Sequence, residues 1–140
     1  MKSTILSFVF VLLAALGLQA QSPTAQVHRI VFQMQSGDTM AHKALMKQLN
    51  NITTVAPDAE LEVVCHGPGL QMLLLEKSRV ADKVAALAAK KVKFLACEFS
   101  MQEQKVVPAQ VLPSAGLVPY GLLEVIGKQE AGWSYIKAGF

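Results

Sequence analysis

Apolar residues follow two periodicities along the chain, one typical of strands and the other of helices. Short runs rich in apolar and β-branched residues predict five buried strands. These strands lie at residues 27–34, 61–65, 92–97, 117–118 and 133–137. Between them, apolar residues recur at helical spacing. The helices lie at residues 40–55, 80–89 and 120–128, with shorter helical turns at 70–75, 99–105 and 108–112.

The order of these elements predicts the fold class. Strands alternate with helices throughout the domain, which is typical of an α/β sandwich with a mainly parallel sheet. Asp38 stands just before the helix at 40–55, where its side chain is a favourable N-cap. The sequence contains neither GxGxxG nor GxxxxGK[ST], so neither a Rossmann nor a P-loop phosphate site is predicted.

The first twenty residues have the form of a secretory signal peptide. Lys2 makes a short basic start, an apolar run covers residues 5–16, and Ala20 offers a small residue at the cleavage position. The apolar run is shorter than the ~20 residues that a spanning helix needs. We therefore expect cleavage after Ala20, a flexible lead-in at 21–26 and a domain at 27–140. The mature protein would be exported, to the periplasm in a Gram-negative bacterium, and would have no membrane segment.

Composition excludes several classes of protein. The chain is 52% hydrophobic and 16% charged, which excludes intrinsic disorder. Its two cysteines are too few for a disulfide-built scaffold. A net charge of +3 with no run of Lys and Arg gives no nucleic-acid footprint, so no nucleic-acid partner is expected.

Unusual residues gather where the predicted strands end. Ligands of parallel sheets bind beyond the carboxyl ends of the strands, and the loops there should meet at one rim. The residues expected to line a pocket at this rim are Asp38, His66, Gly67, Gly69, Ser100 and Tyr120.

Cys97 is the candidate for catalysis at this rim. It ends a predicted strand and precedes a helical turn, where backbone N–H groups and the helix dipole favour a thiolate. A thiolate there could accept sulfur as a persulfide or attack an electrophile. The alternative is structural, because a cysteine at a strand end often serves only for packing.

Cys65 ends the preceding strand as Cys97 ends the next. Three alternatives stay open for the two sulfurs: a structural disulfide, a redox-active pair in which Cys65 is the partner of Cys97, or two independent thiols. His66 could join them, with His42, in a soft metal site, but the spacing matches no standard zinc pattern. We predict no metal, and a structural role for His66 in the His-Gly-Pro-Gly turn.

Several stretches, in this order along the chain, resemble the DsrE/DsrF-like family of sulfur-relay proteins, in particular its small, exported, single-domain branch. The most specific are the His-Gly-Pro-Gly turn at 66–69 and the Phe-Leu-Ala-Cys strand end at 94–97. Others are Arg-Ile-Val-Phe-Gln-Met-Gln-Ser-Gly-Asp at 29–38, Leu-Asn-Asn at 49–51, Val-Pro-Tyr-Gly at 118–121 and Gln-Glu-Ala-Gly-Trp-Ser-Tyr-Ile-Lys at 129–137.

The resemblance implies a three-layer α/β/α sandwich with a five-stranded sheet and a homo-oligomer such as a trimer or hexamer. Cys97 stands where sulfur-relay members carry sulfur as a persulfide and pass it to a partner protein, with no dissociable cofactor. Two departures concern the site. Glu98 and Phe99 replace residues that are often Asn and Thr in the family, and Cys65 stands where a small residue such as Ala is usual.

Two main hypotheses of function follow. The first is an exported, oligomeric DsrE-like protein that acts through Cys97 as a sulfur carrier or redox thiol, together with a sulfur donor or acceptor protein. The second is a non-catalytic oligomeric module that binds a small ligand on the same rim. A third, a scavenger of metal or haem ligands, would use His66 and the two cysteines.

Overall fold

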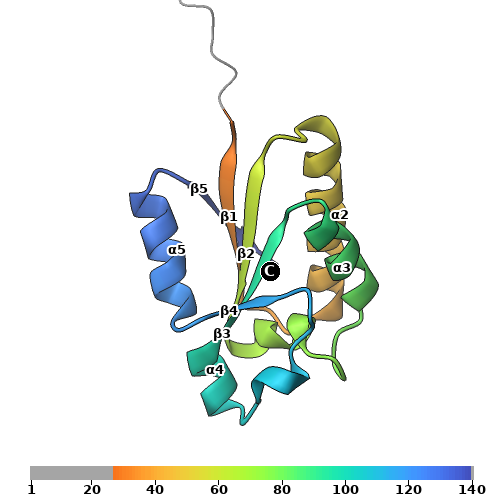
Figure 1. Cartoon of the computed structure of the whole chain (residues 1–140), viewed down its shortest axis with the longest axis vertical. Coiled ribbons are helices and arrows are strands. Elements are labelled where there is room, and N and C mark those ends of the chain that lie inside the picture. Colours follow the sequence, from red (N-terminus) through yellow and green to blue (C-terminus); the bar gives the residue numbers. More distant parts are fainter. Residues whose placement is uncertain (1–26, 140) are drawn as a thin grey trace, which may run out of the picture.

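Five parallel strands form one sheet in the order β4-β3-β2-β1-β5 in the computed structural model, which describes residues 27–139 (Figure 1). The strands are β1 (Arg29–Met34), β2 (Glu60–Cys65), β3 (Lys93–Cys97), β4 (Gly116–Val118) and β5 (Ser134–Ala138). Each lies where the apolar runs predict it. The predicted signal peptide and lead-in, residues 1–26, lie outside the described residues.

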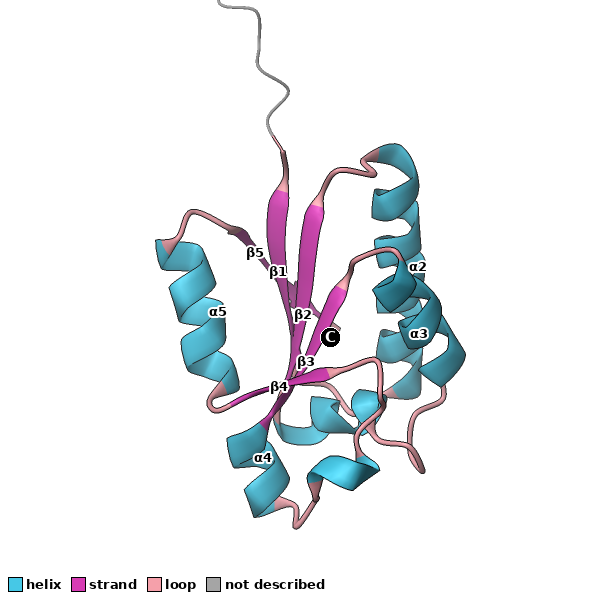
Figure 2. Cartoon of the chain, in the orientation of Figure 1, coloured by secondary structure: helices cyan, strands magenta, loops and turns pink. Residues whose placement is uncertain are grey.

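Helices cover both faces of the sheet (Figure 2). On one face lie α2 (Thr39–Val55) and α3 (Ala81–Ala89), and on the other lies α5 (Gly121–Glu130). The short elements η1 (Gly67–Leu73), α4 (Glu98–Glu103) and η2 (Pro108–Gln110) lie toward the carboxyl ends of the strands. The predicted three-layer α/β/α sandwich with a parallel sheet is thus confirmed. None of the helices in residues 27–139 is long and apolar enough to cross a membrane.

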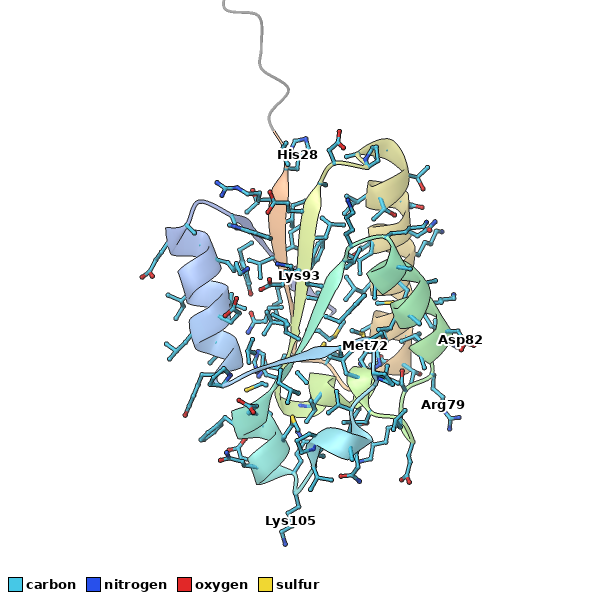
Figure 3. All side chains as sticks on the ribbon, in the orientation of Figure 1. His28, Met72, Arg79, Asp82, Lys93 and Lys105 are labelled. Carbon is cyan, nitrogen blue, oxygen red and sulfur yellow. The ribbon has the colours of Figure 1, made fainter. Side chains whose placement is uncertain are left out.

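The main core lies between the sheet and the helices α2 and α3. Alternate residues of β1, β2 and β3 point into it, among them Phe32, Val63 and Phe94, which are 1% exposed or less. Met72 of η1 is buried in this core, whereas Arg79 and Lys105 point outward into solvent (Figure 3). The opposite face has a smaller core, formed by Val31, Val64, Val118 and Val125.

Helix α5 packs on the sheet through a narrower stripe than its sequence suggests. Leu122, Leu123 and Ile126 are large and apolar, but they are 49%, 63% and 46% exposed. The helix instead turns Gly121 and Val125 toward the sheet, and Lys128, one turn further on, reaches the buried Glu62. The buried Glu62 needs a charged partner, which Lys128 provides, and Gly121 lets the helix approach the sheet closely. These two contacts fix the rotation of α5 about its axis and leave its leucines exposed.

Candidate functional site

The two cysteines end neighbouring strands but lie on opposite faces of the sheet. In the parallel register, Cys65 of β2 lies opposite Ala96 of β3, not opposite Cys97. Successive residues of a strand point to opposite faces, so Cys65 faces α2 and α3 whereas Cys97 faces α5. Both thiols are free. The geometry therefore does not support a disulfide or a redox-active pair of Cys65 and Cys97, because a one-residue offset in register turns the sulfurs apart.

Cys65 is a core residue. It is fully buried among the apolar side chains between the sheet and the helices α2 and α3. Burial raises the pKa of its thiol far above the ordinary value, because a thiolate there would lose its hydration with no cation beside it. Cys65 therefore stays a protonated thiol, and the chemistry of the rim falls to Cys97.

The sulfur of Cys97 accepts a hydrogen bond from the start of α5. The backbone N–H of Gly121, the first residue of α5, donates to Cys97 Sγ over 3.2 Å. The sequence predicts such a donor from the helical turn that follows Cys97, but in α4 the Cys97 side chain makes no capping hydrogen bond. The donor is supplied by a helix that begins 24 residues later in the chain. An N–H donor at a helix N-terminus stabilises an anionic sulfur more than a neutral one.

Gly121 also brings Cys97 and His66 together. A Cβ atom on Gly121 would lie 3.1 Å from the Cβ of Cys97 and 3.2 Å from the Cβ of His66. Both side chains therefore pack against the same point of the backbone. A larger residue at 121 would push them away, so the absence of a side chain there is what allows the close approach.

His66 is part of a chain of three polar side chains on this face. The amide nitrogen Nε2 of Gln33 lies 2.8 Å from His66 Nε2, and the Tyr135 hydroxyl donates to Gln33 Oε1. Burial lowers the pKa of His66, so the imidazole is neutral near pH 7. Sequence reasoning did not single out Gln33 or Tyr135. The available signal was the polar Gln33 inside an otherwise apolar strand.

Gly67, Gly69 and Ser100 shape the rim between β2 and α4. Ser100 Oγ accepts a hydrogen bond from the Gly67 N–H over 2.9 Å, and Gln104 Nε2 donates to the Gly67 carbonyl over 2.7 Å. Gly67 has a φ of +51°, a left-handed conformation that glycine adopts at little cost. Ser100 is 4% exposed, so its hydroxyl serves to hold the turn of Gly67.

Asp38 and Tyr120 lie at the same end of the sheet but on different faces. Asp38 caps α2 as predicted, because its Oδ1 accepts a hydrogen bond from the Met40 N–H over 2.7 Å. It thus belongs to the face opposite Cys97. Tyr120 immediately precedes Gly121, and its ring stacks on Phe99 with 4.6 Å between the ring centroids. The Phe99–Tyr120 pair joins the starts of α4 and α5 on either side of Cys97.

A sequence model of the DsrE/DsrF-like family matches residues 24–138. The chain belongs to this family. Membership associates it with sulfur relay at the level of the family, and the match covers every residue of the Cys97 site described above.

The DsrE/DsrF-like fold is also found in a solved structure. A protein of unknown function from Methanobacterium thermoautotrophicum, MTH1491, superposes with a TM-score of 0.75 at 24% sequence identity. The alignment covers 79% of this chain and 98% of that chain. This similarity supports the fold alone. No curated protein matches the chain.

Metal-ligating side chains do not cluster in the described part of this DsrE/DsrF-like chain. Among residues 27–139, no group of three or more His, Cys, Asp or Glu side chains is placed to hold a metal ion. His42 is buried on the other face, and its Nε2 donates to the Ser36 carbonyl over 2.7 Å.

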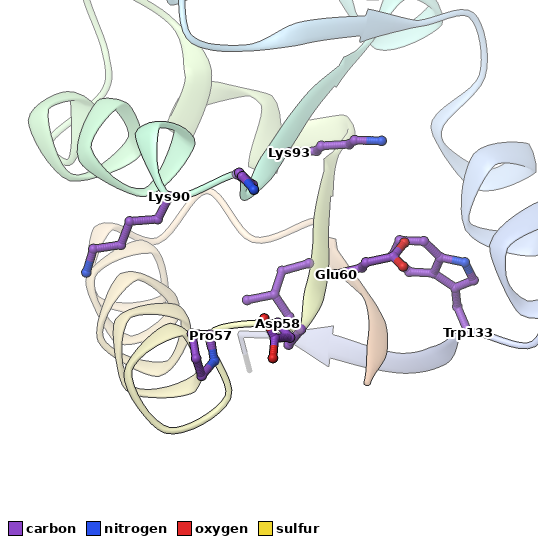
Figure 4. A pocket seen from close by; sticks show the side chains of 9 residues that line it. Pro57, Asp58, Glu60, Lys90, Lys93 and Trp133 are labelled. Atoms are coloured by element: carbon purple, nitrogen blue, oxygen red, sulfur yellow. The ribbon is translucent and has the colours of Figure 1, made fainter. Parts of the chain in front are cut away.

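A cleft of 340 Å³ lies at the opposite, amino-terminal end of the strands (Figure 4). Its lining mixes charges of both signs with Trp133. Lys90, which also lines it, donates to Asn50 Oδ1 over 3.0 Å. The cleft is separated from Cys97 by the length of the sheet, so it contributes no group to the Cys97 site.

Proposed function

We propose that this protein is an exported sulfur carrier in which Cys97 holds sulfur as a persulfide. The observation that carries the proposal is the Gly121 N–H, which donates to Cys97 Sγ over 3.2 Å from the start of α5. Family membership supports a role in sulfur relay. The position of Cys97 at the carboxyl end of a parallel strand, where ligands of this class of fold bind, supports it independently.

The transfer that we propose needs no cofactor. The Cys97 thiolate attacks the outer sulfur of a donor persulfide, R–S–SH. The new S–S bond forms at Cys97 as the donor S–S bond breaks, which gives Cys97–S–SH and the donor thiolate R–S⁻. An acceptor thiolate then takes the outer sulfur in the same way and returns the Cys97 thiolate. No net oxidation occurs in either step, and each requires a donor or an acceptor of sulfur that reaches the rim.

The exposed apolar residues of α5 support a homo-oligomer. Leu122, Leu123 and Ile126 are each about half-exposed or more, on the face of α5 that points away from the sheet. Apolar side chains grouped in this way are typical of a surface that another protein covers. We propose that copies of this chain cover it, in a trimer or hexamer, after export of the protein to the periplasm.

Intact-mass measurement tests the role of Cys97. The mature protein is treated with thiosulfate or with a small-molecule persulfide donor. We expect a gain of about 32 Da, the mass of one sulfur atom, that a reductant removes. Cys97→Ser should abolish the gain, and Cys65→Ala, its matched control on the buried face, should keep it. An adduct that persists in Cys97→Ser would show that Cys97 is not the carrier.

A second candidate function is a non-catalytic oligomeric module that binds a small ligand on the same rim. The burial of Cys97 favours it, because a side chain only 3% exposed meets a donor less readily than an open thiol. This function predicts no sulfur adduct with any donor in the same mass measurement. A thiol-redox role of Cys97 would in turn require an external thiol, since Cys65 faces the opposite side of the sheet.

A further inference from the structure

The chain of hydrogen bonds from Tyr135 through Gln33 to His66 has a direction. An amide nitrogen can only donate, so His66 Nε2, which lies 2.8 Å from Gln33 Nε2, must accept. The other end of the amide, Gln33 Oε1, accepts from the Tyr135 hydroxyl. A neutral imidazole that accepts at Nε2 carries its proton at Nδ1. In this orientation of the Gln33 amide, the hydrogen bonds place the proton of the neutral His66 ring on Nδ1.

The strand order shows that Gln33 and Cys97 lie on opposite sides of His66. His66 follows β2, and the neighbours of β2 are β1 on one side and β3 on the other. Nε2 is directed to Gln33 of β1, on the side away from Cys97, which ends β3. Nδ1 is by covalent geometry the nitrogen nearer Cβ, and the Cβ atoms of His66 and Cys97 meet at Gly121.

The backbone of His66 is held at the same place. Its N–H donates to the Met34 carbonyl of β1, and its carbonyl accepts from the Gly69 N–H, each over 3.1 Å. The side chain is buried, and burial keeps the ring neutral. Neither the backbone nor the ring can therefore turn without breaking hydrogen bonds in the rim.

We infer that Gln33, which is hydrogen-bonded to Tyr135, is a positioning residue of the Cys97 site that holds His66 as the Nδ1–H tautomer. His66 then offers the Cys97 side of the rim a hydrogen-bond donor and not a basic nitrogen. The role of that donor rests on the proposed function, because it requires a persulfide on Cys97. A persulfide that is ionised carries its charge on the outer sulfur, and an imidazole N–H would be a second donor to it beside the N–H of Gly121.

Nitrogen NMR of ¹⁵N-histidine-labelled protein tests the tautomer without any sulfur chemistry. We expect His66 in one neutral form, with the proton on Nδ1. Gln33→Glu places a carboxylate, which can only accept, opposite Nε2. We expect it to add a proton to Nε2 and to raise the pH at which His66 titrates by about 1 unit or more. Gln48→Glu, on the exposed side of α2, adds the same charge and should leave His66 unchanged.

Tyr135→Phe is a milder variant that does not depend on a new charge in the sheet. Tyr135 is 40% exposed, so the loss of its hydroxyl should leave the fold intact. Without that hydroxyl Gln33 Oε1 loses its hydrogen-bond partner, and we expect His66 to become a mixture of both neutral tautomers. The inference is wrong if the wild-type ring carries its proton on Nε2, or if neither Gln33→Glu nor Tyr135→Phe changes the tautomer.

The rate at which Cys97 takes up sulfur distinguishes a hydrogen-bond donor at His66 from a base at that position. Asparagine places an amide N–H near the position of Nδ1, so we expect His66→Asn to load Cys97 at close to the wild-type rate. His66→Leu should be slower by about tenfold, the loss of one hydrogen bond to a charged group. Equal losses in both variants would refute the donor role. If the wild-type protein takes up no sulfur, the proposed function fails, while the NMR result still decides the role of Gln33.

Discussion

Gly69→Ala is expected to prevent folding at 37 °C, with a loss of about 4 kcal/mol or more in the free energy of unfolding. A Cβ atom at this position would lie 2.2 Å from the carbonyl oxygen of Met34 and 2.7 Å from its carbonyl carbon. Both are backbone atoms of the last residue of β1, so no side chain can move aside to make room. The turn after β2 would have to shift as a whole.

Thermal and urea unfolding of the purified variants measure this effect. Gly127→Ala is the control, because a Cβ atom at Gly127 of α5 would meet nothing within 4 Å. We expect this helical substitution to stabilise the protein by about 0.5–1 kcal/mol. A Gly69→Ala protein that unfolds at the wild-type temperature would show that the turn is not packed against β1 as described. Because the Gly69 N–H donates to the His66 carbonyl, a partly folded variant should also lose the single His66 tautomer.

Strands and helix starts were predictable because their signals are local. The apolar runs mark all five strands, and Asp38 caps α2 as its place before the helix indicates. The parallel order follows from the alternation of strands and helices, since each crossover must pass over the sheet. These inferences need only the pattern of residues along the chain.

The face of the sheet to which each cysteine points depends on the register between neighbouring strands. The local sequence around each cysteine does not determine that register. Cys65 and Cys97 both end a strand, and the sequence alone leaves a pair of sulfurs open. The structure places Cys65 opposite Ala96, and this offset of one residue sends the two thiols to opposite faces. The sequence likewise does not show which face of α5 packs on the sheet. Its leucines suggest one face, but the residues of the sheet beneath the helix select another.

The polar chain at His66 could not be predicted because it joins three distant segments. Tyr135 and Gln33 are 102 residues apart, and Gln33 and His66 are 33 apart. They meet only because β5 returns to the edge beside β1, which places its residues next to Gln33. The sequence predicts the hydrogen-bond donor to Cys97 in the adjoining helix α4, and this prediction is wrong for a similar reason. The donor is the N–H of Gly121, 24 residues further along the chain.

Lys128→Met is expected to destabilise the protein by about 3 kcal/mol at pH 7, because it leaves a buried carboxylate without its cation. The side chain of Glu62 is 2% exposed, and its Oε2 lies 2.7 Å from Lys128 Nζ. Its Oε1 has no hydrogen-bond partner in residues 27–139. The Lys128 ammonium also lies 4.4 Å from the centre of the Trp133 ring.

The pH dependence of the loss identifies its cause. Burial raises the pKa of Glu62 from its ordinary value of 4.5, although Lys128 opposes the shift. A carboxyl with a raised pKa binds its proton more tightly in the folded state, so the contribution of Glu62 to stability is fully present below pH 4.5 and is lost as the pH rises through the folded pKa. Without Lys128 the pKa rises further. The loss in Lys128→Met should therefore be large at pH 7 and shrink toward pH 4.5.

Urea unfolding at pH 4.5 and pH 7 measures both parts of this prediction. Glu124→Gln is the matched control, because Glu124 lies 3.5 Å from Lys128 on a side chain 31% exposed, and the change should cost less than about 0.5 kcal/mol. The double variant Glu62→Gln with Lys128→Met should recover most of the stability, since it removes the buried charge. An equal loss at both pH values would assign the effect to lost packing of the lysine stem against Trp133. In that case the Glu62–Lys128 ion pair would not be what holds α5 on the sheet and keeps Gly121 against Cys97.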